Sequence, residues 1–100
     1  METSKPSLRI SFDGDFLKQL RLLEREEHQI IGKAINDVSA AWGQPHLHAG
    51  TGLRKLREKI FECRSGLKTR LVFELLADGS LYFHLMGNHD EIRRFLKLSR

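Results

Sequence analysis

The fold is decided by residues 59–89, which read KIFECRSGLKTRLVFELLADGSLYFHLMGNH. Residues 60–65 and 69–76 alternate apolar and polar side chains, the pattern of strands with one buried face. Residues 81–86 form one apolar run that encloses His84, which predicts a central strand buried on both faces. Tight connections separate the three runs, and Asp78-Gly79 in the second is typical of a hairpin turn because it accepts positive φ at low cost.

The alternation also assigns side chains to faces. A hairpin that begins at Ser65-Gly66 would pair the first two strands. Their core face then carries four apolar side chains, from Phe61, Cys63, Leu71 and Phe73. Their outer face carries Glu62, Arg64 and Arg70, so three charged groups are expected to share one surface.

The residues before this stretch predict a strand and helices. Residues 8–12 alternate and predict an initial strand, after which Asp13-Gly-Asp15 can cap a helix. Residues 16–42 keep one helical phase, but Glu24 and Glu27 interrupt its apolar stripe. We expect two helices with a break at these glutamates, because one helix of almost thirty residues would be about 40 Å long and would overhang the domain.

The remaining elements complete the expected order. A strand over residues 53–57 is the least certain of them, and residues 91–98 form an amphipathic helix that Asp90 can cap. The pattern β-α-α-β-β-β-β-α predicts an α+β fold. Its N-terminal strand and two-helix hairpin pack on a small, mostly antiparallel sheet of four to five strands, with a C-terminal helix. Residues 1–100 are expected to form a single domain.

Composition narrows the possible functions. The formal charge of +4 favours an anionic partner, either a nucleic acid or an acidic protein. No apolar run approaches the roughly 18 residues that span a bilayer, and residues 1–6 lack a secretory pattern. The single cysteine, Cys63, is expected to be a small buried side chain in a reducing compartment. We therefore expect a cytoplasmic protein that does not engage a membrane.

Two groups of side chains remain open to a functional or a structural interpretation. Arg54, Lys55, Arg57 and Lys59, with Lys68 in the hairpin, could contact RNA phosphates or form a solvated sheet edge. His46-x-His48 could ligate a metal, but no carboxylate or cysteine follows at ligand spacing, so we expect no metal and no cofactor.

The charges of the outer face have a possible chemistry. RNA is cleaved without a metal when its 2′-hydroxyl loses a proton, cations hold the pentavalent phosphate, and the leaving 5′-oxygen gains a proton. Arg64 and Arg70 suit the phosphate, Glu62 could be the base and His89 the acid. The structural alternative is an ordinary cross-strand ion pair between Glu62 and the arginines.

The sequence resembles the RelE/ParE superfamily of toxins from type II toxin–antitoxin modules. The similarity lies in the helical pair and in four short segments, Gly52-Leu-Arg-Lys-Leu56, Phe61-Glu-Cys-Arg-Ser65, Arg70-Leu-Val-Phe73 and Gly87-Asn-His-Asp90 before a terminal helix. RelE-like members are endoribonucleases that cut messenger RNA in the ribosomal A site without a metal, leaving a 2′,3′-cyclic phosphate and a 5′-hydroxyl. The resemblance thus implies a RelE-like fold and, as partners, a cognate antitoxin, the ribosome and messenger RNA.

The resemblance also assigns roles to residues. The phosphate-gripping arginine of these enzymes falls on Arg70, the basic residue before the hairpin on Arg64, and the basic strand-end residue on His89. Some members carry an acid for which Glu62 is the nearest match. The sequence departs from the best-studied branch at Ile60 and Glu62, where that branch has lysines, and at Phe95, where it has a tyrosine.

These departures keep two alternatives open. One is a ParE-like inhibitor of DNA gyrase that acts by protein contact without catalysis. The other is an inactive toxin fold that only binds its antitoxin. His89 beside Arg64 and Arg70 favours the nuclease, because a protein that only binds needs no titratable group there.

Overall fold

The computed structural model describes residues 8–43, 50–66 and 68–98. The expected leader, the His46-x-His48 pair and Leu67 of the hairpin lie outside these ranges. The elements, in chain order, are β1 (Ile10–Phe12), α1 (Gly14–Leu22), α2 (Arg25–Ala41), β2 (Arg54–Arg57), β3 (Ile60–Ser65), β4 (Thr69–Leu75), β5 (Leu81–Gly87) and α3 (His89–Leu98). The predicted order of elements and the α+β class are confirmed, including the uncertain strand at β2.

The five strands form one mixed sheet in the order β1-β5-β4-β3-β2. β1 pairs parallel with β5, and every other pairing is antiparallel. β2 is an edge strand with exposed charges at Arg54, Lys55 and Arg57. The predicted, mostly antiparallel sheet is therefore confirmed, with β4 at its centre.

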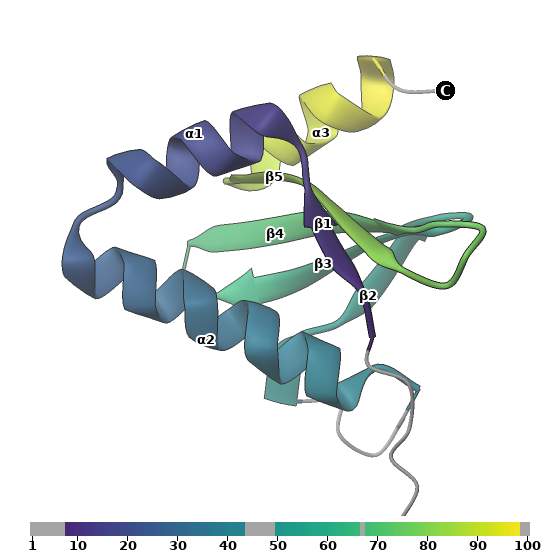
Figure 1. Ribbon diagram of the computed structural model, residues 1–100. Coiled ribbons are helices and arrows are strands. Elements are labelled where there is room, and N and C mark those ends of the chain that lie inside the picture. The colour runs from purple at the N-terminus through teal and green to yellow at the C-terminus, as the bar shows by residue number, and fades with distance from the viewer. Residues whose placement is uncertain (1–7, 44–49, 67, 99–100) are drawn as a thin grey trace, which may run out of the picture.

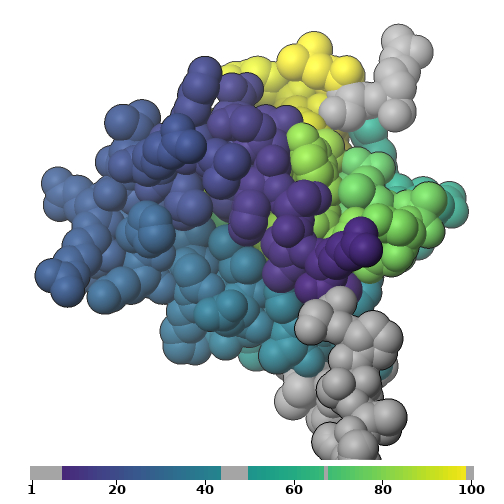
Figure 2. Space-filling model, in the orientation of Figure 1, coloured from purple at the N-terminus to yellow at the C-terminus, as the bar shows by residue number. Residues whose placement is uncertain are grey.

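The main core lies between one face of the sheet and the first two helices. Figure 1 shows α1 and α2 along one side of the sheet, and in Figure 2 these helices and β1 cover much of the visible face. The buried side chains of this core are Phe16, Ile31, Ile35, Val38, Cys63, Leu71, Phe73, Leu81, Phe83 and Met86. The four residues predicted for the core face of the hairpin all contribute, since Phe61 packs against this cluster as a partly buried side chain.

The outer face of the sheet is covered in part by α3. Val72 and Ile92 are 0% and 4% exposed but lie outside the main core cluster. α3 contacts β4 and β5, and the ring of its Phe95 lies 5.1 Å from that of His84. This second, smaller apolar layer lies over β4 and β5 and does not cover the outer face of β2 and β3, where charged residues lie.

The N-terminal helices end and begin as the sequence predicts. Asp13 caps α1 by accepting a hydrogen bond from the backbone N–H of Asp15 at 2.9 Å. α1 ends at Leu22, and the extended backbone of Leu23 and Glu24 separates it from α2. The predicted break between two helices is confirmed. No helix in the described part of the chain is both long and apolar enough to cross a membrane.

Two predictions about the C-terminal part are wrong. The cap of α3 is Asn88, not Asp90: Asn88 Oδ1 accepts from the N–H of Glu91 at 2.9 Å, and Glu91 Oε1 accepts from the N–H of Asn88 at 2.8 Å. β5 is an interior strand but is not buried on both faces. Tyr82 and His84 are only partly buried, because α3 crosses that face without covering it completely.

Candidate active site

Glu62 is a buried carboxylate held between two arginines. Its Oε2 atom lies 3.3 Å from Nε of Arg54 and 3.3 Å from Nη1 of Arg70. The Glu62 side chain is 3% exposed, against 34% for Arg70 and 64% for Arg54. A buried charge is tolerated when it is paired and hydrogen-bonded. The two guanidinium groups therefore neutralise Glu62 and leave the cluster with one net positive charge facing outward.

Strand register explains why these residues meet. Arg54 pairs with Glu62 across β2 and β3. Val72 lies opposite Glu62 and Arg64 opposite Arg70, so Arg70 is two pairs along the β3–β4 ladder and is the diagonal neighbour of Glu62 on the same face. Directly paired residues of antiparallel strands project to the same side. The structure thus places Glu62, Arg64 and Arg70 on the predicted common face and adds Arg54 to them.

The Arg64 side chain lies across Gly52, at the edge of the sheet. A Cβ atom at Gly52 would stand 2.6 Å from Nε of Arg64 and 3.1 Å from its Nη2. Arg64 also lines a small cavity of about 210 Å³ whose other residues include Thr51 and Asp37 of α2. Although its backbone pairs with that of Arg70, the guanidinium of Arg64 is placed by Gly52, outside the Glu62 cluster.

Replacing Gly52 by alanine should lower the free energy of unfolding by about 1 to 2 kcal/mol, since Gly52 has φ 68° and an L-residue is strained there. Alanine would also displace Arg64. Urea unfolding of Gly52→Ala, alone and in an Arg64→Ala background, isolates the clash with the guanidinium, because the double variant keeps only the backbone strain and the 3.1 Å contact with the Cβ atom of residue 64. Equal stability of Gly52→Ala and the unaltered protein would contradict this account.

His89 is the first residue of α3 and is exposed. Gly87 lies opposite Arg70 in the β4–β5 pairing, so His89 follows only two residues after the partner of Arg70. The mutual hydrogen bonds of Asn88 and Glu91 fix the start of the helix, and Gly87 makes room for them because a Cβ there would stand 2.7 Å from Glu91 Oε1. His89 is therefore held at the same end of the sheet as Arg70.

The other predicted RNA-binding cations are all exposed. Arg54, Lys55 and Arg57 lie on β2, Lys59 in the turn after it and Lys68 in the β3–β4 hairpin. Arg57 donates a hydrogen bond to the carbonyl of Leu96 in α3, which links the edge strand to the helix. Within the described ranges, no group of three or more His, Cys, Asp or Glu residues could hold a metal ion.

A second set of polar contacts on the outer face was not predicted. Nε2 of His84 lies 2.8 Å from Oε1 of Glu74, and the Tyr82 hydroxyl donates to Oδ1 of Asp13 at 2.9 Å. The N–H of Asp15 and the Tyr82 hydroxyl lower the pKa of Asp13. His84 is thus held by a carboxylate of the neighbouring strand.

Cys63 is a structural side chain, as predicted. It is 1% exposed, and burial, with a further contribution from the charge of Glu62, raises the pKa of its thiol to about 12. A thiol is nucleophilic only as its thiolate. Cys63 therefore contributes to core packing and is not a candidate nucleophile.

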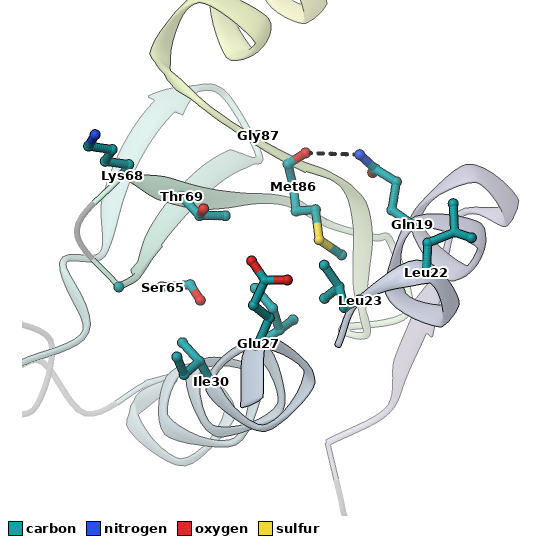
Figure 3. Close-up of a pocket in the computed structure, with 12 residues that line it drawn as sticks. Gln19, Leu22, Leu23, Glu27, Ile30, Ser65, Lys68, Thr69, Met86 and Gly87 are labelled. Atoms are coloured by element: carbon teal, nitrogen blue, oxygen red, sulfur yellow. Dashed lines mark hydrogen bonds between the residues drawn. The ribbon is translucent and has the colours of Figure 1, made fainter. Parts of the chain in front are cut away.

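An apolar groove of about 460 Å³ opens where the α1–α2 junction meets the ends of β3, β4 and β5. In Figure 3, Glu27 and Met86 point into it, and Gln19 donates to the Met86 carbonyl at 3.3 Å. Leu22 and Ile30 are 84% and 47% exposed beside it. Ser65, which also lines the groove, is buried, and its Oγ has no hydrogen-bond partner among the described residues. The groove thus combines exposed apolar surface with an unsatisfied hydroxyl.

Comparison with known proteins gives matches in structure only. No protein-family model matches the chain, and no curated protein sequence matches it. The archaeal RelE–RelB complex from Pyrococcus horikoshii OT3 contains a chain that is 12% identical, with a TM-score of 0.66 over 83% of this chain and 96% of that one.

Two bacterial structures are also similar, with lower TM-scores and higher identities. The intact E. coli RelBE toxin–antitoxin complex gives 20% identity and a TM-score of 0.60, over 81% of this chain and 95% of that one. The YoeB–YefM complex from Staphylococcus aureus gives 19% identity and a TM-score of 0.60, over 82% and 97%. These similarities cover nearly the whole of each matched chain. The described chain therefore has the RelE-like toxin fold, as its sequence predicts.

Proposed function

We propose that the chain is the toxin of a type II toxin–antitoxin module and that it cleaves messenger RNA on the ribosome without a metal. Two observations support this. The first is the fold, which is that of RelE. The second supports the chemistry: Arg54 and Arg70 converge on Glu62, and His89 begins α3 at the same end of the sheet. The proposed partners are a cognate antitoxin, the ribosome and messenger RNA, and the proposed place of action is the cytoplasm.

In the proposed reaction, the 2′-oxygen of a ribose attacks the adjacent phosphorus and the bond from phosphorus to the 5′-oxygen breaks. The products are a 2′,3′-cyclic phosphate and a 5′-hydroxyl. Arg70 would hold the non-bridging oxygens, because its planar guanidinium matches a phosphate and keeps its charge. Arg54 would share this task, since most of its side chain is open to solvent.

Glu62 takes a different role from that of a base in contact with RNA. With 3% of its side chain exposed and both arginines on one oxygen, it has no open path to a 2′-hydroxyl. We assign it as a positioning residue that fixes the two guanidinium groups before RNA binds. Such preorganisation saves the cost of ordering them in the transition state. The proton of the 2′-hydroxyl would then pass to solvent.

His89 is the proposed acid for the leaving 5′-oxygen. It is exposed, and imidazole is the side chain whose unperturbed charge changes near neutral pH. Phe95, which replaces the tyrosine of the best-studied branch, has no proton to exchange, and its ring packs on His84. The acid must therefore come from elsewhere, and His89 is the candidate nearest Arg70 along the β5–α3 connection. Arg64 remains a candidate for a phosphate farther along the strand.

Induction of the chain in a bacterium, followed by mapping of messenger RNA 5′-ends, tests this function. The unaltered chain should produce cuts with codon periodicity, and His89→Ala should lose them while keeping the fold. His28→Ala is the matched control, because His28 is an exposed histidine on α2. Growth arrest with intact messages and altered plasmid supercoiling would overturn the nuclease in favour of gyrase inhibition. Absence of toxicity would leave a fold that only binds antitoxin.

We further propose that an amphipathic helix of the antitoxin covers the apolar groove of Figure 3. Two of the similar solved structures are complexes, one of RelE with RelB and one of YoeB with YefM. Exposed Leu22 and Ile30 would gain burial, at about 25 cal/mol per Å² of apolar surface.

Binding of the protein encoded by the neighbouring gene tests the groove. Ile30→Asp should weaken the complex at least about tenfold, because a carboxylate would be desolvated on binding. Leu98→Asp is the control, since Leu98 is 79% exposed on α3, away from the groove. Equal weakening by Ile30→Asp and Leu98→Asp would exclude this docking site.

A further inference from the structure

A basic groove lies between the edge strand and the C-terminal helix, apart from the Glu62 cluster. It has a volume of about 430 Å³ and is lined by Arg57 of β2 and by Asp90, Arg93, Arg94, Leu96 and Lys97 of α3. All four of its cations are exposed. With a single carboxylate against four cations, the groove has a strong excess of positive charge.

Packing of the helix fixes where these charges point. Ile92 is 4% exposed and Phe95 packs on His84, so the apolar side of α3 lies against the sheet. Arg93, Arg94 and Lys97 occupy the remaining positions and are open to solvent. The hydrogen bond from Arg57 to the Leu96 carbonyl holds Arg57 against the same helix. The groove is therefore a built feature that joins two elements distant in sequence.

One pair of cations in the groove is unfavourable for the isolated protein. Arg93 and Lys97 are four residues apart, and like charges at that spacing destabilise a helix by a few tenths of a kcal/mol. Elsewhere on the surface, Lys33 pairs with Asp37 at 2.8 Å. Within residues 8–43, 50–66 and 68–98, no ion pair forms with Arg93, Arg94 or Lys97. An anionic ligand would remove this repulsion.

A β-bulge connects the groove to the Glu62 cluster. In regular alternation Arg54 and Arg57 would face opposite sides of the sheet, since they are three residues apart. The register shifts between Lys55 and Arg57, so Arg54 pairs with Glu62 and Arg57 with Ile60. Glu62 and Ile60 share the outer face, and Arg57 therefore joins Arg54 there. A cationic path runs from Arg70 through Arg54 and Arg57 to α3.

We propose that this groove binds the sugar–phosphate backbone of a single-stranded RNA segment next to the phosphate held by Arg70. This inference rests on the proposed nuclease function. Three of its four cations are arginines, which bind phosphate through a planar fork. The continuous path toward Arg70 fits a chain of regularly spaced phosphates. Contacts to the sugar–phosphate backbone carry no sequence information, so the binding is expected to be independent of sequence.

Binding of a short 2′-O-methyl RNA oligonucleotide at rising KCl concentration tests the groove. This probe lacks the 2′-hydroxyl and cannot be cleaved. The variant Arg93→Gln, Arg94→Gln, Lys97→Gln should bind at least about tenfold more weakly at low salt, and the slope of log K against log salt should fall by about 2, as three lost phosphate contacts require. The matched control removes three exposed charges from α1 and α2 through Lys18→Gln, Arg21→Gln and Arg25→Gln, and should keep the slope.

Each outcome decides the proposal. Identical slopes for the two triple variants would overturn it. So would a polyglutamate peptide that binds the unaltered protein more tightly than the oligonucleotide and loses affinity only with the α3 variant, because the surface would then serve an acidic protein. If the α3 variant has the smaller salt slope but the unaltered chain cuts no messenger RNA, RNA binding by the groove is supported and the nuclease function is rejected. If the unaltered chain cuts messenger RNA but the α3 variant keeps the full salt slope, only RNA binding by the groove is rejected.

Discussion

Replacing Arg70 by alanine is expected to lower the rate constant of RNA cleavage by about a hundred- to a thousandfold, the usual loss when a group that stabilises transition-state charge is removed. Arg70 is a partly exposed member of the Glu62 cluster. It lies opposite Gly87, the last residue of β5 before α3. Single-turnover cleavage of an RNA on purified ribosomes measures the chemical step directly. Substrate binding should change less, because Arg54 and the cations of β2 remain.

Two further variants make the Arg70 result interpretable. Arg70→Lys keeps the charge but not the planar fork and should recover only part of the rate. Arg9→Ala is the matched control, because Arg9 is an exposed arginine near Asp78 at the other end of β5. Thermal unfolding shows whether each variant is folded. A folded Arg70→Ala protein that cleaves at the unaltered rate would refute the proposed role of Arg70.

The double variant Arg54→Ala, Arg70→Ala is expected to lose about 3 to 5 kcal/mol of stability, the cost of leaving a buried charge without a partner. Each single variant should lose much less, since the other arginine still contacts Oε2 of Glu62. The effects should therefore be strongly non-additive, as expected for two residues that share one partner. Urea unfolding of the four proteins at neutral pH measures this coupling.

A third substitution should restore the double variant. Glu62→Gln removes the unpaired charge and should recover most of the lost stability. Additive losses that Glu62→Gln fails to reverse would mean that the arginines act independently of Glu62.

The sequence predicted the faces of the central hairpin but not its closest contact. Alternation alone places Glu62 and Arg70 on one side, because the period of a strand is two residues. The contact of Glu62 with Arg54 depends instead on the register of β2, a four-residue edge strand with a bulge. No local pattern specifies where such a bulge falls. Arg54 was consequently predicted only as one cation of a basic run.

The sequence contains the pattern that caps α3, although Asp90 was predicted as the cap instead. Asp90 is a good capping residue by type, yet Asn88-x-x-Glu91 has the spacing of a capping box, with an acceptor followed three residues later by glutamate. The structure uses that pair. The pairing of His84 with Glu74 was harder to foresee. It depends on the register shift between Val72 and Phe73, which makes His84 the extra residue of β5.

The parallel pairing of the first strand with the last has a consequence for synthesis. Ile10 aligns with Leu81, so β1 cannot find its place in the sheet until β5 has been made, some seventy residues later in the chain. The β2–β4 meander is local in sequence and can form earlier, whereas contacts between distant segments are slow to close. Completion of the sheet and addition of α3 therefore follow formation of the meander. A nascent chain lacks an assembled site until β5 and α3 have been made, which delays any activity that the site would have.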